Sequence, residues 1–123
     1  MQIRNKTYGD VLVLSPEGRI DHANSEDFRQ ALSPFVERCS ANGERMVLDL
    51  AGVDYISSAG LRCFMIAEKQ AKAQGGTIVV AGMQPVVNEI FEISRFTLVF
   101  ETFASVRDAL AKISPAALKA FGA

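Results

Sequence analysis

The stretch Val53-Asp54-Tyr55-Ile56-Ser57-Ser58-Ala59-Gly60-Leu61-Arg62 lies between an apolar run and a helical pattern, and it decides the fold assignment. The preceding run, residues 46–50, predicts a buried strand, and the following pattern predicts a helix over about 59–74. Ser57 can act as the N-cap of that helix, its hydroxyl accepting a hydrogen bond from a backbone N–H one turn in. Ser58 then lies in the first turn, where the free N–H groups and the helix dipole favour a negative group. One hydroxyl is enough for the cap, so the second is available for chemistry.

The composition indicates one folded domain. A chain of 123 residues, of which 49% are hydrophobic, can bury a core without metals or disulfides. Its net charge of −1 gives no electrostatic basis for binding nucleic acid. No apolar run is long enough for membrane insertion, and residues 1–6 lack the apolar segment of a signal peptide. We therefore expect a cytoplasmic protein. Cys39 and Cys63, both on predicted helices, have no metal-ligand spacing and are expected to be reduced thiols.

Hydrophobic periodicity predicts strands and helices in the order β-β-α-β-α-β-α-β-α. Gly9-Asp10 predicts a hairpin turn, and Pro34 predicts a kink in the first helix. Strands are expected at 3–8, at 11–14 with a bend before 19–21, and at 46–50, 77–81 and 98–100. Three helices follow N-caps at Asn24, Ser57 and Ser105, and a fourth begins at Pro85. The first helix ends at Asn42-Gly43. Residues 116–123 form a tail that frays or continues as a helix. This order is typical of an α/β fold with a mostly parallel sheet.

The loops after the parallel strands are the expected location of function. In open α/β sheets, ligand sites lie at the carboxyl ends of the strands. These ends correspond to residues 20–22, 54–60 and 82–84. We therefore expect the three loops to converge on one surface, with the two serines near its centre.

Several kinds of chemistry fit a serine at such a position. A nucleophile elbow has the pattern Gly-x-Ser-x-Gly, but here only Gly60 matches, and the one histidine, His22, precedes the serines. A phosphorylated receiver domain would use Asp49 or Asp54, yet the early strand offers only Asp21 for the required acidic pair. A phosphoryl group on Ser58 would add about −1.5 to −2 charges, which a helix start tolerates and a docked partner does not. Serines that only cap the helix explain the same residues equally well.

Three motifs, in this order, resemble a STAS domain of the anti-sigma factor antagonist type. Gly18-Arg19-Ile20-Asp21 is similar to the family's Gly-x-(Leu/Ile)-Asp motif. Residues 48–61, LDLAGVDYISSAGL, are similar to its strand and phosphorylation loop, and residues 76–87, GTIVVAGMQPVV, to its next strand, loop and helix start. The resemblance covers about 3–113. It implies a STAS fold, that is, a mixed, mostly parallel sheet with an N-terminal antiparallel hairpin and about four helices. The corresponding STAS domain is 1–115, with 116–123 as a C-terminal tail.

The resemblance also implies a partner-switching function without enzymatic activity or a cofactor. The protein would bind an anti-sigma factor with serine kinase activity, be phosphorylated and released, and be reset by a serine phosphatase. Alignment on Gly60-Leu61 places the phosphoacceptor at Ser58, with Ser57 as the adjacent alternative; many members carry Asp at position 57 and a second hydroxyl residue at Ala59. The alternative is a constitutive STAS subunit of a lipid-transport or stress-sensing complex, without a phosphorylation cycle. The candidate partner-binding residues are Asp21, His22, Asn24, Ser57, Ser58, Ala59, Arg62, Met83 and Gln84.

Overall fold

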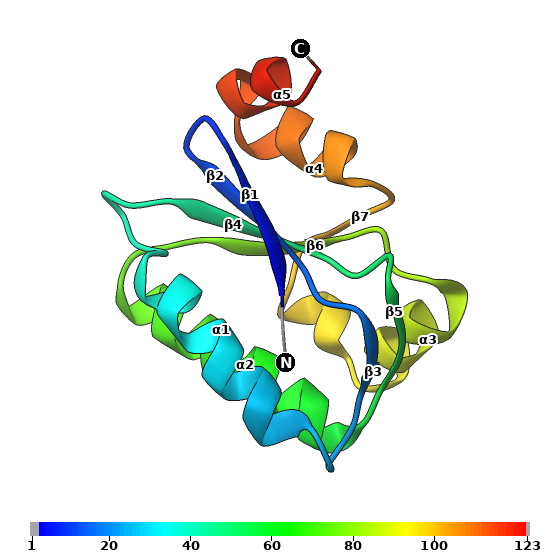
Figure 1. Cartoon of the computed structure of the whole chain (residues 1–123). Helices are drawn as coiled ribbons and strands as arrows, with labels where there is room; N and C mark the ends of the chain where they lie inside the picture. Colours follow the sequence, from blue (N-terminus) through cyan, green and yellow to red (C-terminus); the bar gives the residue numbers. More distant parts are fainter. Residues whose placement is uncertain (1–2, 123) are drawn as a thin grey trace.

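A five-stranded sheet separates two groups of helices in the computed structural model, which describes residues 3–122 (Figure 1). The strand order is β1-β2-β4-β6-β7, with β1 antiparallel to β2 and the other pairs parallel. The strands are β1 (Arg4–Tyr8), β2 (Val11–Ser15), β4 (Arg45–Asp49), β6 (Ile78–Ala81) and β7 (Thr102–Phe103). Gly9 has φ of 57° in the β1–β2 turn, a conformation that favours glycine and confirms the predicted hairpin.

The two faces of this sheet are covered by different helices. α1 (Ser25–Glu37), α2 (Ser58–Ala73), α3 (Pro85–Ile93) and the short 3₁₀ helix η1 (Phe96–Leu98) supply the larger hydrophobic core on one face. α4 (Val106–Ile113) and α5 (Pro115–Gly122) cover part of the other face (Figure 1). In β2, Leu12 and Leu14 belong to the first core and Val11 and Val13 to the second. This two-sided burial explains why the β2 sequence is continuously apolar.

A second, two-stranded sheet carries the chain toward the serines. β3 (Gly18–Ile20) pairs in parallel with β5 (Val53–Ile56). We predicted a bend at 15–18 before residues 19–21 and a loop at 54–60. Instead, Gly18 has φ of 88° and its N–H donates to Gly52 O (2.8 Å), which begins a separate ladder. In β5, Val53 and Ile56 at the two ends are buried and Asp54 between them is exposed. This short pattern does not by itself distinguish a strand from a loop.

The predicted strand at 98–100 is wrong. Arg95 adopts a left-handed conformation with φ of 62°, and the chain forms η1 instead. Leu98 is 79% exposed, whereas Phe100 is buried in the larger core. The edge strand lies further on, where Thr102 pairs with Val80. Val99 is partly buried against the same core, so two adjacent residues face inward, whereas successive residues of a strand point to opposite faces.

The boundaries of two helices also differ from the prediction. α1 ends at Glu37 and not at Asn42-Gly43, and Cys39 lies beyond the helix. Pro34 lies inside α1 as expected, while its kink stays a prediction. The tail continues as α5, a fifth helix, whose Ala117 is buried near Gly9. Cys39 and Cys63 are both buried free thiols. Among residues 3–122, none of the helices has the length and apolarity that crossing a membrane requires.

Candidate functional site

The two serines at the start of α2 have different surroundings. Ser57 is the N-cap: its backbone is extended, with φ of −82° and ψ of 172°, and its Oγ accepts from the Gly60 N–H at 3.2 Å. The Ser57 N–H donates to Ile20 O at 2.8 Å, which ties the cap to the end of β3. Ser58 is the first residue of α2 and is exposed. Its hydroxyl makes no hydrogen bond with any residue of the described chain, 3–122.

Gly60 allows the helix start to approach β3 closely. A Cβ at position 60 would lie 2.8 Å from Ile20 Cγ2 and 2.9 Å from both Ile20 O and Ile56 Cγ2. Such separations are shorter than van der Waals contact, so only glycine fits without movement. The packing of Gly60 therefore fixes where Ser58 emerges at the surface.

The turn between β3 and α1 is closed by Asp21 and Asn24. The Asp21 carboxylate accepts from the N–H groups of Ala23 (3.0 Å) and Asn24 (3.3 Å). The Asn24 side chain accepts from the Asp21 N–H at 2.9 Å and donates to Arg19 O at 2.8 Å. Asn24 precedes α1 as predicted, but its side chain makes no cap hydrogen bond to the helix. Asn24 therefore occupies the predicted N-cap position without capping α1 through its side chain, because its amide holds the turn instead.

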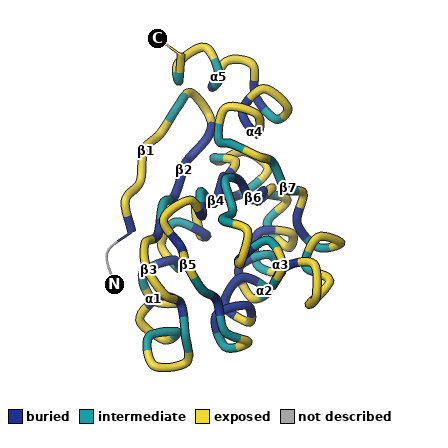
Figure 2. Tube along the Cα trace, turned by 90° about the vertical axis from the view of Figure 1, so that its right-hand side faces the viewer, coloured by how far each residue is buried: buried dark blue, intermediate teal, exposed yellow. Residues whose placement is uncertain are grey.

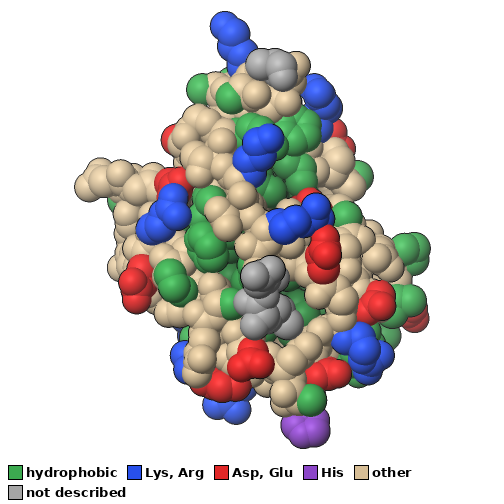
Figure 3. Space-filling model, in the orientation of Figure 1, with side chains coloured by type: hydrophobic (Ala, Val, Ile, Leu, Met, Phe, Trp, Pro, Cys, Tyr) green, Lys and Arg blue, Asp and Glu red, His purple; other side chains and the backbone are tan. Residues whose placement is uncertain are grey.

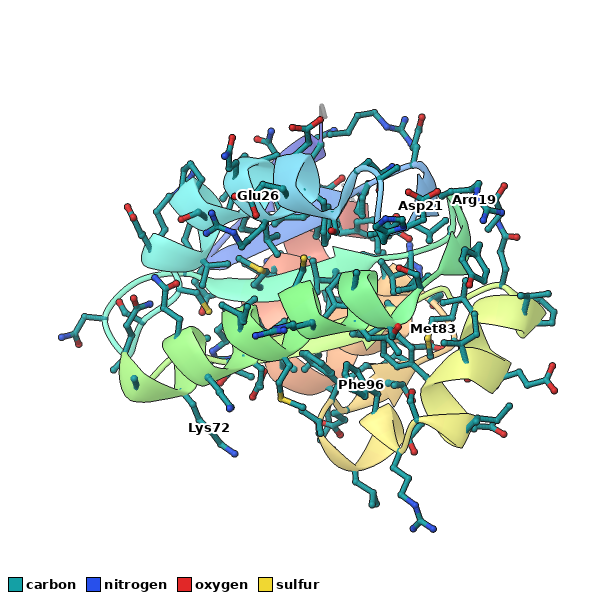
Figure 4. The ribbon with its side chains drawn as sticks, turned by 90° about the horizontal axis from the view of Figure 1, so that it is seen from below. Arg19, Asp21, Glu26, Lys72, Met83 and Phe96 are labelled. Atoms are coloured by element: carbon teal, nitrogen blue, oxygen red, sulfur yellow. The ribbon has the colours of Figure 1, made fainter. Side chains whose placement is uncertain are left out.

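Asp21 is kept ionised by its partners. Partial burial raises the pKa of the Asp21 carboxyl, but hydrogen bonds from Ala23, Arg19 and Asn24 outweigh this effect and hold the pKa below its usual value. The Arg19 guanidinium lies 3.4 Å from Asp21 and 4.4 Å from the centroid of the Tyr55 ring. Figure 4 shows Arg19 and Asp21 beside one another at the end of the small sheet. Sequence reasoning did not find the role of Arg19 and Tyr55, because they become partners only through the β3–β5 register.

Two of the three predicted loops meet. The Ser57–Ile20 hydrogen bond joins the serine loop to the end of β3, and the Cys63 Sγ lies 3.4 Å from Ser25 O, which joins the starts of α2 and α1. We call the resulting area the serine surface. It comprises Asp21, His22, Asn24, Ser57, Ser58, Ala59 and Arg62, of which His22, Ser58 and Arg62 are exposed.

The third loop lies at the other end of β5. The Gln84 amide donates to Ala51 O at 2.8 Å, in the turn that precedes β5, whereas the serines follow β5. A four-residue strand spans about 13 Å. Met83 packs against the larger core and borders a separate hollow of about 410 Å³ between α3 and β7. Figure 4 shows Asp21 beside Arg19, with Met83 apart from them toward α3. Met83 and Gln84 therefore lie near the start of β5 and the serines near its end, and the convergence of all three loops on one surface stays a prediction.

The serine surface offers an accessible hydroxyl for modification or docking. No hydrogen bond within residues 3–122 joins Ser57 or Ser58 to His22, so the partner that activates a nucleophilic serine is not in place. The same residues contain no cluster of three or more side chains suited to holding a metal ion. The surface carries both charges, with Arg62 one helical turn after Ser58 and Asp21 held in the adjoining turn.

Comparison with known proteins agrees with this geometry. The sequence model of the STAS domain family matches residues 2–109. A protein of Bordetella bronchiseptica with the provisional name anti-sigma factor antagonist BtrV is 38% identical over 109 residues, which cover 88% of this chain and 90% of that protein. The anti-sigma factor antagonist from Mycobacterium paratuberculosis has a TM-score of 0.79 at 20% identity, covering 91% of this chain and 92% of that one. SpoIIAA in its unphosphorylated form has a TM-score of 0.71 at 16% identity, covering 91% and 96%. These two structures share the fold of this chain.

Proposed function

This chain belongs to the STAS domain family, and on that premise we propose that it is an anti-sigma factor antagonist that phosphorylation of Ser58 switches off. It binds an anti-sigma factor through the serine surface and has no enzymatic activity of its own. The anti-sigma factor acts as a serine kinase, a serine phosphatase reverses the modification, and the exchange takes place in the cytoplasm. The observation that carries this proposal is the difference between the two serines. The Ser57 hydroxyl is used by the cap, whereas Ser58 is exposed and its hydroxyl makes no hydrogen bond among residues 3–122.

A phosphate on Ser58 is compatible with the fold. Ser58 opens a helix of 16 residues, where the N-terminal N–H groups and the dipole favour a negative charge. The same phosphate would bring about −1.5 to −2 charges into a docked interface. A partner that packs against Ser58 would have to desolvate this charge, so its complex would dissociate while the domain stayed folded. Met83 and Gln84 contribute only if the partner extends along β5.

The test is phosphate transfer from an anti-sigma factor kinase of the same organism, with ATP and Mg²⁺, followed by mass spectrometry. We expect a single phosphate on Ser58 in wild type and in Ser57→Ala, and none in Ser58→Ala. Transfer of the phosphate to Ser57 would identify Ser57, and not Ser58, as the phosphoacceptor. No transfer to either serine by a kinase that phosphorylates its own partner in parallel would refute the switch.

Binding of the same anti-sigma factor distinguishes the switch from a constitutive assembly subunit. We expect Ser58→Ala to bind like wild type and Ser58→Asp to bind at least about tenfold more weakly, with an unchanged circular dichroism spectrum. Equal binding by both variants would favour the assembly subunit.

A further inference from the structure

The sheet face opposite α1 and α2 carries a groove that the proposed switch does not use. It has a volume of about 550 Å³ and lies between β1, β2 and the end of β4 on one side and α4 and α5 on the other. The helices cover only part of this face, so the groove remains open along β1. Figure 3 shows hydrophobic side chains exposed between Lys and Arg side chains in this upper part of the molecule, and Figure 2 shows β1 exposed along most of its length.

The walls of the groove are apolar and partly aromatic. Lys6 pairs with Val13 across the β1–β2 ladder, so both side chains face the same side of the sheet. Val106 of α4 and Phe121 of α5 line the groove opposite them. The Phe121 ring meets the Tyr8 ring edge to face, with centroids 5.1 Å apart. Phe121 lies beyond residue 109, where the match to the STAS family ends, so this wall comes from a segment outside that match.

Within residues 3–122, the Asp49 carboxylate of the groove is held by hydrogen bonds, and only one of the two cations that line the groove is ion-paired. The Asp49 carboxylate accepts from Ser15 Oγ (3.2 Å) and from the Ala51 N–H (3.1 Å). Arg4 is paired with the exposed Glu17. The Lys6 ammonium, in contrast, forms no ion pair or hydrogen bond within residues 3–122 and lies 5.5 Å from the Tyr8 ring centroid. The groove therefore presents an available cation beside an aromatic wall.

We propose that this groove binds a small amphipathic anion. The flat apolar body of the ligand packs against Tyr8, Val13, Val106 and Phe121, and its single carboxylate accepts charge-assisted hydrogen bonds from Lys6. The volume lies in the usual range of small-molecule sites, about 300–1,000 Å³. The site is independent of Ser58, because it lies on the other face of the main sheet from α2.

The test is a titration with naphthalene-2-carboxylate, followed in the two-dimensional amide NMR spectrum of the whole chain. Its uncharged analogue naphthalene-2-carboxamide serves as the matched ligand. We expect saturable shifts on β1, β2, α4 and α5 with the carboxylate and about tenfold weaker binding of the carboxamide, the ratio that one charge-assisted hydrogen bond supplies.

Variants separate the groove from other apolar surfaces. Lys6→Gln should abolish the preference for the carboxylate, and Phe121→Ala should weaken both ligands. Lys119→Gln, which removes a charge from the exposed side of α5, should change neither. The proposal is overturned by shifts centred on the exposed Val86, Ile93 and Leu98, by equal affinity for the two ligands, or by the absence of saturation. Retained dispersion of the amide spectrum shows that each variant is folded.

Discussion

Gly60 sets the position of the serine surface at the scale of a single residue. Its hydrogen atoms occupy a space in which a methyl group would meet Ile20 O at 2.9 Å. A backbone oxygen has little freedom to move, so an added side chain must displace the start of α2. This displacement would also lengthen the hydrogen bond from the Gly60 N–H to Ser57 Oγ.

We therefore expect Gly60→Ala to destabilise the domain by about 1–3 kcal/mol, the usual cost of overpacking, despite the better helix propensity of alanine. Urea unfolding measures this change. The control is Gly122→Ala, where a Cβ would meet nothing closer than 3.7 Å and stability should stay unchanged. An equal effect of the two substitutions would mean that the close contact with β3 has no energetic weight.

The carboxylate of Glu68, on α2, is partly buried. One of its carboxylate oxygens is buried without a hydrogen-bond partner among residues 3–122. Burial raises the pKa of Glu68 above its ordinary value of 4.5, and the nearby Lys72 offsets only part of this rise. The folded state therefore holds this proton more tightly than the unfolded state does.

This difference makes stability depend on pH. The free energy of unfolding should fall as the pH rises from the ordinary glutamate pKa through the raised one, and then level off. Glu68→Gln should remove this loss, so the variant gains stability over wild type in that window and keeps the gain at neutral pH. Urea unfolding at several pH values measures it, with Glu89→Gln on the exposed side of α3 as control. A gain that does not change with pH would contradict the burial of a charge.

At the scale of secondary structure, the beginning of α2 depends on one of the two serines. Ser57 satisfies a first-turn N–H group that would otherwise lack an acceptor, whereas Ser58 makes no side-chain hydrogen bond within the described chain. The two positions are adjacent, yet their energetic roles are separate.

Ser57→Ala should cost about 1 kcal/mol of stability, the usual loss of an N-cap, and Ser57→Asp should keep most of it. Ser58→Ala should stay within about 0.5 kcal/mol of wild type, because an exposed, unbonded hydroxyl contributes little. Chemical denaturation of the three variants measures these differences. A larger loss from Ser58→Ala than from Ser57→Ala would reverse the assignment of the cap.

For the whole molecule, Phe64 joins the helices of the larger core. Its ring centroid lies 5.4 Å from that of Phe28 on α1, 6.2 Å from that of Phe91 on α3 and 6.5 Å from that of Phe100 before β7. Phe28, Phe64 and Phe91 come from three helices that cover the same sheet face. The position of the serine surface relative to the sheet therefore rests on this aromatic cluster.

Phe64→Ala should destabilise the domain by about 3–5 kcal/mol, through lost burial and the cavity that remains. Ile93→Ala, at a side chain that is 76% exposed, should change stability by less than about 0.5 kcal/mol. Guanidinium unfolding followed by circular dichroism compares the two. A loss below about 1 kcal/mol for Phe64→Ala would show that the cluster is not the structural centre of this face.

The sequence by itself determined the features that depend on neighbouring residues. The cap at Ser57, the turn at Gly9 and the start of α3 at Pro85 each rest on contacts or backbone conformations within one turn, and residue types alone predict them. The alternation of strands and helices likewise follows from local periodicity, and it predicted the α/β fold class.

The tertiary structure decided the features that depend on residues far apart in the chain. β5 exists because residues 53–56 pair with β3, and this pairing moves the serines away from Met83 and Gln84. Phe121 forms a groove with Tyr8 across more than a hundred positions. The physical reason is that strand pairing and core packing gain their free energy from contacts between segments that are distant in the sequence. The secondary-structure propensity of a single residue carries no information about these contacts.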